Sequence, residues 1–337
     1  EKSERIMNGI AYWAAFYREN PHRFVKDYLN VNLKLFQKIL LYMMMRSNYF
    51  MYLAARGQGK TFLTALFCVV RCILFPKTKI CVASATRTQA NEVLLKITED
   101  FMKNYGWGSE NLRREIKSYT VGQNKAEINF KNGSFIKVAT ASDSGRGMRG
   151  NVLVVDEFRM VDLNTINTVL RKFLTAPRSP GYLNNPKYEH LTERNIEMYM
   201  SSAWYKSHWS FSKLQAYFAN MLDDTKRYFC CGLPYNLAIK EGLLSREQVE
   251  DEMSEADFDS VMIIAGERPD IRTIMSSTPT GKRGKFYQAC TIPEMGFNQH
   301  FHPSTHNPNW CDKMEAEFRA SLTASGYVHE VEAEFGV

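Results

Sequence analysis

The sequence contains no run of eighteen consecutive apolar residues, so it offers no segment of the length that crosses a membrane as a helix. Its first residues, Glu1–Arg5, are mostly charged and lack the shape of a signal peptide. The seven cysteines include no Cys-x-x-Cys pair, which gives no sign of a zinc site or of a disulfide framework. These absences predict a protein of a reducing cytosol that makes no membrane contact.

The composition is that of an ordinary globular protein, with 45% hydrophobic and 23% charged residues. A chain of 337 residues has room for one large α/β domain or for two smaller ones. The formal net charge of +7 suits a polyanionic partner, but it is too small to identify one.

The segment Ala54–Thr61, Ala-Ala-Arg-Gly-Gln-Gly-Lys-Thr, fits the P-loop pattern, with Ala54 where the first glycine is usual. An apolar run, Tyr49–Leu53, predicts a strand before it, and Thr61–Phe75 predicts a buried helix after it. In that context, backbone N–H groups and a helix N-terminus hold phosphates. Lys60 would then reach the β- and γ-phosphates, and the Thr61 hydroxyl would hold Mg²⁺. The alternative is a glycine-rich turn that happens to precede a buried helix.

A second acidic segment strengthens the nucleotide hypothesis. Val152–Val155 predicts a buried central strand, and Asp156 and Glu157 follow at its carboxyl end, where ligands bind in open α/β sheets. Asp156 would contact the Mg²⁺ shell, and Glu157 would orient and deprotonate the attacking water. A strand that runs into an acidic turn is the alternative for this segment alone. Together with the P-loop, the segment indicates an ATPase.

Three further sets of residues are candidates for the same site. Arg146 and Arg149 lie in a glycine-rich loop before the acidic strand, where an arginine would stabilise transferring phosphate in its own subunit or in a neighbour. This loop could instead contact DNA or be a solvated basic loop. Gln37, on a predicted helix over Leu33–Met45, could bind the adenine edge, although an exposed helical glutamine is the ordinary case.

Ser201 and Ser202 follow another predicted strand, Asn195–Met200, and their hydroxyls could sense the γ-phosphate. A second Ser-Ser pair occurs at Ser276-Ser277, followed by a basic segment, Lys282–Lys285, which is a plausible DNA contact.

The predicted fold is an α/β P-loop NTPase of the RecA/ASCE-like type. It has a mostly parallel sheet flanked by helices and a helical N-terminal extension. We expect three parts: a helical extension over 1–45 that carries Gln37, the ATPase core over 46–262, and a C-terminal subdomain or connector over 263–337. Further elements are predicted as a hairpin with its turn at Lys131–Ser134, a helix after Glu157 to about Leu174, a strand over Tyr228–Leu233 and an acidic helix over Ser245–Phe258.

In order and spacing these segments resemble the ATPase domain of the large terminase subunit, the DNA-packaging motor of tailed bacteriophages. The residues that carry the resemblance are Leu35-Phe36-Gln37, Ala55–Thr61, Ala83–Ala90, Val154–Glu157 and Ser201–Trp204.

The resemblance implies ATP and Mg²⁺ as cofactors and assigns roles to residues. Gln37 would sense adenine, Arg56 would be the extra P-loop arginine, and Ser201-Ser202 would be the coupling motif. Gly57, Gln58 and Gly59 would join Lys60 and Thr61 in the nucleotide loop.

The resemblance also implies partners: double-stranded DNA, the portal and procapsid, a small terminase subunit, and other copies of this chain in a ring in the host cytoplasm. Two features depart from the family pattern. The coupling motif has two candidates, and residues from about Ile264 onward resemble a different branch. The family's nuclease domain would follow the last residues, so no nuclease activity is expected here. A superfamily 2-type helicase or remodeller and an ATP-dependent docking module without turnover are the alternative functions.

Overall fold

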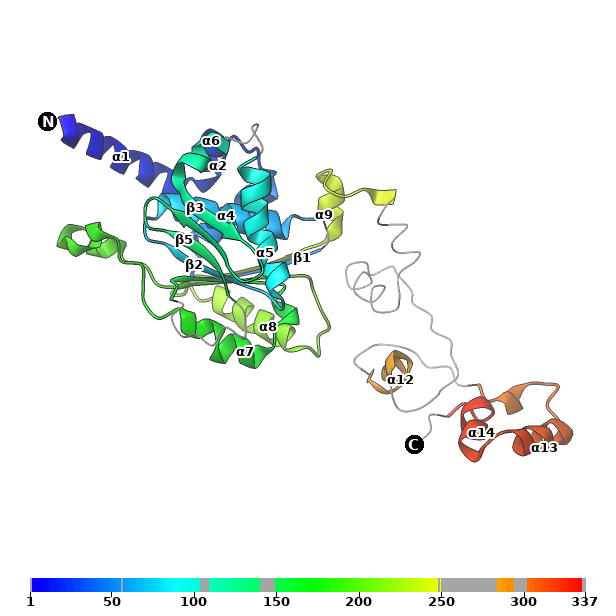
Figure 1. Cartoon of the computed structure of the whole chain (residues 1–337). Helices are drawn as coiled ribbons and strands as arrows, with labels where there is room; N and C mark the ends of the chain where they lie inside the picture. Colours follow the sequence, from blue (N-terminus) through cyan, green and yellow to red (C-terminus); the bar gives the residue numbers. More distant parts are fainter. Residues whose placement is uncertain are drawn as a thin grey trace. The chain divides into compact units, whose positions relative to one another are not determined.

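The protein is described by a computed structural model that covers residues 2–55, 57–103, 109–139, 149–247, 249, 284–293 and 302–334. The chain divides into two compact units, Glu1–Glu250 and Asp251–Val337, which are described separately. Figure 1 shows the first unit as a twisted sheet with helices on both faces.

The sheet of the first unit has eight strands in the order β3-β4-β5-β2-β6-β7-β1-β8. The six strands from β5 to β8 in this order run parallel, whereas β4 pairs with β3 and β5 in antiparallel fashion. The strands are β1 (Tyr49–Ala54), β2 (Lys79–Ala83), β3 (Ile116–Val121), β4 (Ala126–Phe130), β5 (Phe135–Ala139), β6 (Val152–Asp156), β7 (Ile196–Ser201) and β8 (Tyr228–Leu233).

Alternate residues of the central strands belong to two separate apolar cores, because successive side chains of a strand point to opposite faces. Phe50 and Tyr52 of β1 lie in one core, and Met51 lies in the other. Both faces are covered, which is why the central strands are apolar throughout. The first core includes α3 (Leu35–Arg46), α4 (Lys60–Leu74), α5 (Arg87–Leu95) and η1 (Lys96–Phe101); the second includes η3 (Phe158–Met160), α7 (Leu163–Thr168), η4 (Leu170–Phe173) and α8 (Trp209–Met221).

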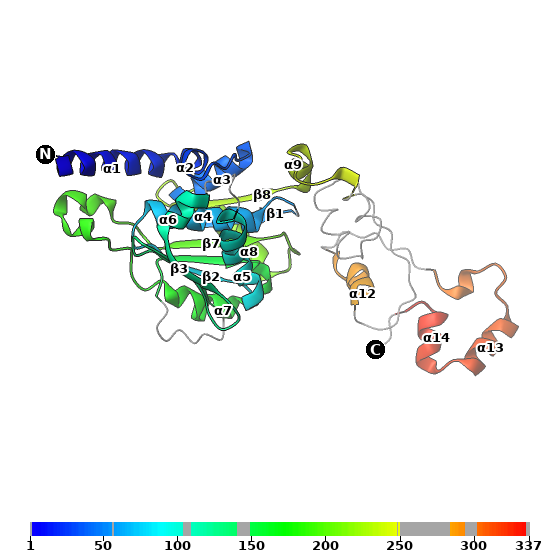
Figure 2. The same cartoon turned by 45° about the horizontal axis from the view of Figure 1, so that its top comes forward.

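The N-terminal extension is helical, as predicted. α1 (Lys2–Glu19) ends where Pro21 begins α2 (Pro21–Leu29), because proline suits the first turn of a helix and cannot continue the preceding one. No residue of α1 is buried, and Ile6, Ile10 and Phe16 are each at least half exposed. Figure 2 shows α1 projecting from the rest of the first unit.

The continuous helix predicted after Glu157 and up to about Leu174 is wrong. Three short helices, η3, α7 and η4, take its place. Val161 and Asp162 have extended backbones, with ψ 135° and 134°, which end η3 and interrupt a continuous helix. The Asp162 side chain then caps α7 by accepting a hydrogen bond from the Thr165 N–H.

The remaining elements of the first unit include one predicted hairpin and several short helices. The hairpin at Lys131–Ser134 joins β4 to β5, as predicted, and α6 (Ser109–Glu115) leads to β3. The stretch after Leu174 contains two short 3₁₀ helices, η5 (Gly181–Asn184) and η6 (Pro186–Leu191). α9 (Tyr235–Lys240) follows β8.

The described part of the second unit consists of α12 (Gly284–Thr291), η8 (Ser304–His306), α13 (Asp312–Ser321) and α14 (Ala324–Glu330). The Arg319 guanidinium of α13 lies 4.2 Å from the ring centre of Tyr327 in α14. Three predicted features lie outside the described residues. They are the second Ser-Ser pair, Lys282 and Arg283 of the basic segment, and most of the predicted acidic helix after Ser245. Among the helices that are described, none combines the length and the hydropathy needed to cross a membrane.

Candidate active site

The predicted P-loop lies between β1 and α4, as the strand–loop–helix pattern requires. Gly57 and Gly59 have φ values of 80° and 69°, a backbone region that strains residues with a side chain. Gly59 precedes the first turn of α4 and provides no side chain to cap it. The first N–H groups of a helix have no intrahelical partners, so this end of α4 can bind an anion.

Gln58 has a structural contact that the sequence did not reveal. Its side chain is fully buried, and its amide Nε2 donates to the carbonyl oxygens of Leu233 and Pro234 at 3.0 and 2.5 Å. The Tyr52 hydroxyl donates to Gln58 Oε1 at 2.7 Å. The side chain therefore fixes the P-loop to the end of β8 and the start of α9, and any contact with nucleotide falls to the Gln58 backbone.

Asp156 ends β6 and is 5% exposed. Its Oδ1 accepts a hydrogen bond from the Glu157 N–H at 3.1 Å. Burial, followed by the charge of Glu157, raises the pKa of Asp156 from 3.8 to about 6. A divalent cation would offset both effects, and carboxylate and hydroxyl oxygens are ligands that Mg²⁺ prefers. Thr61 is in the first turn of α4, which follows β1, and Asp156 ends β6; β1 and β6 both pair with β7 in parallel, so both residues lie at the carboxyl edge of the sheet. Asp156 and Thr61 therefore fit a magnesium ion.

Four predicted residues form one hydrogen-bonded cluster. Lys60 Nζ lies 3.4 Å from Glu157 Oε1 and donates to Ser202 Oγ at 3.1 Å. Ser201 Oγ donates to Glu157 Oε2 at 3.1 Å. The cluster forms because β7 lies between β1 and β6 in a parallel sheet, which brings the carboxyl ends of all three strands together.

The backbone of Glu157 adopts the left-handed conformation, with φ 46° and ψ 47°. This conformation is uncommon for a residue with a side chain and costs of order 1–3 kcal/mol. Such strain clusters at functional sites, where it holds a side chain in a required direction. Here it turns the Glu157 carboxylate back toward Lys60 and Ser201.

Arg159 is a site residue that the sequence analysis did not select. Its Nε lies 3.7 Å from Glu157 Oε2, and its guanidinium stacks 4.0 Å from the ring centre of Trp204. Arg159 Nε and Nη1 are buried and make no hydrogen bond to any residue that the structure describes. The sequence signal for Arg159 is its place two residues after the acidic pair, at the carboxyl end of β6.

Gln37 is buried in α3, which disagrees with the ordinary case of an exposed helical glutamine. Its Oε1 accepts a hydrogen bond from the Lys34 N–H at 3.0 Å. Its Nε2 lies 3.9 Å from the position that a Cβ on Gly59 would take, so the amide is next to the P-loop.

The predicted arginines are placed differently. Arg56 and Arg146 lie outside the described residues. Arg149 is exposed and lies before the amino end of β6, whereas Asp156 and Glu157 lie at the carboxyl end. Within one subunit the structure does not bring Arg149 to the cluster around Lys60 and Glu157.

Comparison of the sequence with known families gives a match to the family described as "Terminase large subunit, T4likevirus-type, N-terminal" over residues 51–262. That segment holds the P-loop, the acidic pair and Ser201-Ser202, and it covers more than half of the chain. The chain belongs to the terminase large subunit family. Large terminase subunits are the motors of viral genome packaging, and the P-loop NTPase-type sheet of this terminase chain agrees with that membership.

Solved structures with similarity to this terminase chain include the ATPase domain of the Thermus phage P74-26 large terminase. It has 11% sequence identity and a TM-score of 0.48, over 72% of this chain and 95% of that one. The large terminase of a thermophilic bacteriophage, solved in complex with ATP-gamma-S, has 10% identity and a TM-score of 0.45. That match covers 67% of this chain and 50% of the other. No curated protein sequence matches the chain.

Proposed function

We propose that this chain is the ATP-hydrolysing part of a packaging motor that moves double-stranded DNA into a procapsid. The observation that carries the proposal is the cluster of Lys60, Glu157, Ser201 and Ser202 at the carboxyl edge of the sheet, directly beside the start of α4. The cluster brings together a cation for phosphate and a carboxylate for water. Each of these charged groups is hydrogen-bonded to one serine hydroxyl, Lys60 to Ser202 and Glu157 to Ser201.

Each residue has a specific role in hydrolysis. The α4 N-terminus, Gly57, Gln58 and Gly59 hold the phosphates through backbone N–H groups, while Lys60 binds the β- and γ-phosphates. Thr61 and Asp156 hold Mg²⁺, which would neutralise the developing phosphate charge. Gln37 senses the adenine.

Glu157 is the general base in this proposal. Its Oε1 is paired with Lys60 Nζ at 3.4 Å. When Lys60 turns to the phosphates, the Glu157 carboxylate is released from this ion pair and becomes available to orient water and take its proton. Arg56 and Arg146 remain candidates for the charge-stabilising arginine, Arg146 within one subunit or between neighbours. Arg149 lies at the opposite edge of the sheet in its own subunit, so it remains a candidate only as an arginine supplied to a neighbour.

Ser201 and Ser202 couple the site to β7. Ser201 donates to Glu157 and Ser202 accepts from Lys60, so a movement of either charged group changes a hydrogen bond at the end of this central strand. Loss of the γ-phosphate would let Lys60 return to Ser202 and Glu157. That exchange of partners is a local step of the kind that switches amplify.

The partners follow from family membership. We propose that the chain acts in the host cytoplasm as a homo-oligomeric ring docked on the portal of a procapsid, with double-stranded DNA as its substrate and a small terminase subunit as an accessory. The division into a helical extension over 1–45, an ATPase core over 46–262 and a C-terminal part over 263–337 is part of this proposal.

The test compares steady-state ATP turnover of the wild type with and without double-stranded DNA and purified procapsids. Turnover that rises only when DNA and procapsids are both present supports the packaging motor. Stimulation by DNA alone favours a helicase or remodeller. Nucleotide binding without turnover under every condition favours the docking module.

A further inference from the structure

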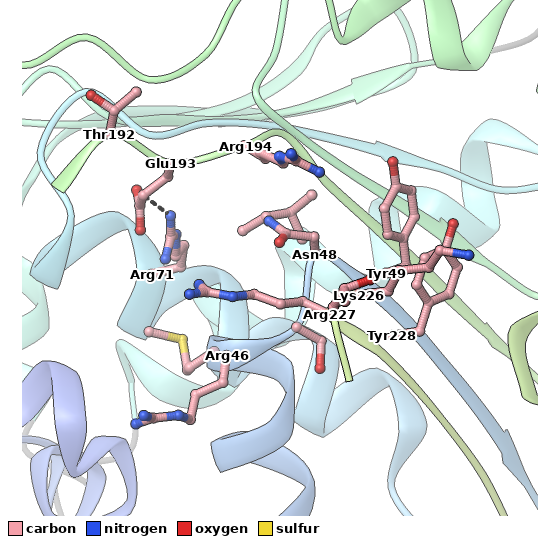
Figure 3. Close-up of a pocket in the computed structure, with 14 residues that line it drawn as sticks. Arg46, Asn48, Tyr49, Arg71, Thr192, Glu193, Arg194, Lys226, Arg227 and Tyr228 are labelled. Atoms are coloured by element: carbon pink, nitrogen blue, oxygen red, sulfur yellow. Dashed lines mark hydrogen bonds and ion pairs between the residues drawn. The ribbon is translucent and has the colours of Figure 1, made fainter. Parts of the chain in front are cut away.

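A basic cavity lies at the amino edge of the sheet in the first unit. Its volume is about 520 Å³, and its lining includes five basic side chains, Arg46, Arg71, Arg194, Lys226 and Arg227, but only one carboxylate, Glu193. Figure 3 shows these side chains, with the Arg227 side chain extending toward the Arg71–Glu193 ion pair. A volume of this size lies in the range of small-molecule sites, roughly 300–1,000 Å³.

The cavity is separate from the candidate active site. Its lining includes Tyr49, Ile196 and Tyr228, which are the first residues of β1, β7 and β8. The active-site residues lie at the carboxyl ends of the strands. Lys60 begins the helix after β1, Ser201 ends β7, and Glu157 follows β6. Five or six residues of strand separate the two edges, which corresponds to roughly 15–20 Å.

The positive charge of the cavity is not neutralised within the described structure. The carboxylate of Glu193 is shared by two buried arginines, because Arg71 and Arg178 both lie 2.7 Å from Glu193 Oε2. The buried Nε of Arg71 has no hydrogen-bond partner among the described residues. One carboxylate faces two guanidinium groups, so the cluster of Arg71, Arg178 and Glu193 carries a net positive charge.

The exposed part of the lining adds to this excess. Arg46 pairs with Glu19, and Lys226 pairs with Asp223, so these two cations have partners from outside the cavity. Arg194 and Arg227 are exposed and have neither an ion pair nor a hydrogen bond from their side chains to any described residue. Arginine is the residue best suited to bidentate recognition of phosphate oxygens.

We propose that this cavity is a phosphate-binding site, with Arg194 and Arg227 as the groups that contact the phosphates. The inference does not depend on ATP hydrolysis at the other edge. The same chemistry has two sources, the sugar–phosphate backbone of double-stranded DNA and a free phosphate compound. An acidic segment of another protein is a different class of partner, and its binding would count against the proposal.

The test uses a variant in which Arg194→Gln and Arg227→Gln remove two charges. The matched control, Lys117→Gln with Lys131→Gln, removes two exposed charges near β3 at the far end of the strand order. All four side chains are exposed, so we expect unchanged melting temperatures for both proteins. Binding of a short DNA duplex is measured against salt concentration. If both arginines contact the DNA backbone, the slope of log affinity against log salt becomes shallower by about two in the cavity variant and not in the control.

A second readout identifies the source of the phosphate. The wild-type chain is treated with phenylglyoxal, which modifies free arginines, in the presence of the duplex or of inorganic pyrophosphate. Modification is then measured by mass spectrometry on the peptides that contain Arg194 and Arg227. Because this readout is specific for the two arginines, pyrophosphate bound at the P-loop does not affect it.

Protection by the duplex together with the shallower slope assigns the site to the DNA backbone, and protection by pyrophosphate assigns it to a free phosphate compound. Either result supports the proposal. The duplex could protect the two arginines from phenylglyoxal without any change in slope. This result would mean that DNA bound elsewhere shields the arginines. It overturns the proposal unless pyrophosphate also protects them. No protection by either reagent, with equal slopes for the two variants, overturns it as well.

Discussion

Lys60 Nζ lies 3.4 Å from Glu157 Oε1, so the cation proposed to bind phosphate is paired with the carboxylate proposed to activate water. Neither group can perform its role while this pair is closed. We therefore expect that binding of phosphate by Lys60 opens this pair and frees the Glu157 carboxylate to act on water.

Lys60→Ala is expected to weaken ATP binding. A hydrogen bond to a charged group contributes about 1.5–3 kcal/mol, which corresponds to roughly 10- to 100-fold in affinity. Titration calorimetry with a non-hydrolysable ATP analogue and Mg²⁺ measures the effect, and Lys131→Ala, an exposed lysine beyond β4, is the control. An unchanged affinity in the Lys60 variant would contradict the assigned P-loop.

Asp156→Asn is expected to stabilise the nucleotide-free chain above about pH 6. Because the pKa of Asp156 is higher in the folded chain than its ordinary value of 3.8, the folded state binds more protons between the two values. Its contribution to stability therefore falls as the pH rises from 3.8 to about 6 and is then constant, at a cost of about 3 kcal/mol.

Thermal unfolding of the two proteins across this pH range measures the difference. The melting temperature of the Asn variant should exceed that of the wild type increasingly up to about pH 6, and Mg²⁺-dependent stabilisation by nucleotide should be lost. A difference that is independent of pH would mean that Asp156 is not held in a protonation-sensitive environment.

Gln58→Ala is expected to destabilise the first unit, because it leaves the buried Tyr52 hydroxyl and the Leu233 and Pro234 carbonyls without this partner. Each such loss costs about 1–3 kcal/mol. A double-mutant cycle with Tyr52→Phe, followed by urea unfolding, should give a coupling energy of about 0.5–3 kcal/mol. Strictly additive effects would show that the Tyr52–Gln58 hydrogen bond does not contribute to stability.

Arg159→Ala is expected to slow turnover while nucleotide still binds, since its guanidinium lies beside Glu157 and its buried Nε and Nη1 make no hydrogen bond to a described residue. Loss of one preorganised donor costs about 10²–10³ in kcat. Arg159→Lys should not restore the rate, because an ammonium lacks the planar fork of donors.

The matched control for Arg159 is Arg149→Ala. In an isolated subunit this variant should keep its basal turnover, because Arg149 lies at the opposite edge of the sheet. A loss of turnover by the Arg149 variant that appears only in the assembled ring would indicate an arginine supplied to a neighbour. If Arg159→Ala keeps the wild-type kcat, Arg159 has only a packing role against Trp204.

The sequence predicted the parts of the site that depend on neighbouring residues. The strand before the P-loop, α4 after it, and the position of Asp156 and Glu157 at the end of β6 all follow from local patterns, and the fold class is confirmed. Ser201 and Ser202 were selected by their place after a strand, and the structure brings them to Glu157 and Lys60.

Contacts between distant segments could not be predicted in this way. Gln58 bonds to Leu233 and Pro234, far along the chain, and no local pattern indicates that pairing. The continuous helix predicted after Glu157 failed because Val161 and Asp162 have extended backbones, which end η3 before the Asp162 side chain caps a new helix, α7. The basic cavity likewise combines Arg46, Arg71, Arg194 and Arg227 from four separate segments.

The most direct test of the central claim is single-turnover ATP hydrolysis by Glu157→Gln beside the wild type. Glutamine keeps the shape of the side chain and an oxygen for the Ser201 hydroxyl, but it cannot accept a proton from water. The exposed Glu189→Gln variant is the control. We predict that Glu157→Gln still binds ATP and hydrolyses it about 10²–10⁴-fold more slowly, while the control is unaffected. Hydrolysis by Glu157→Gln at the wild-type rate would contradict it.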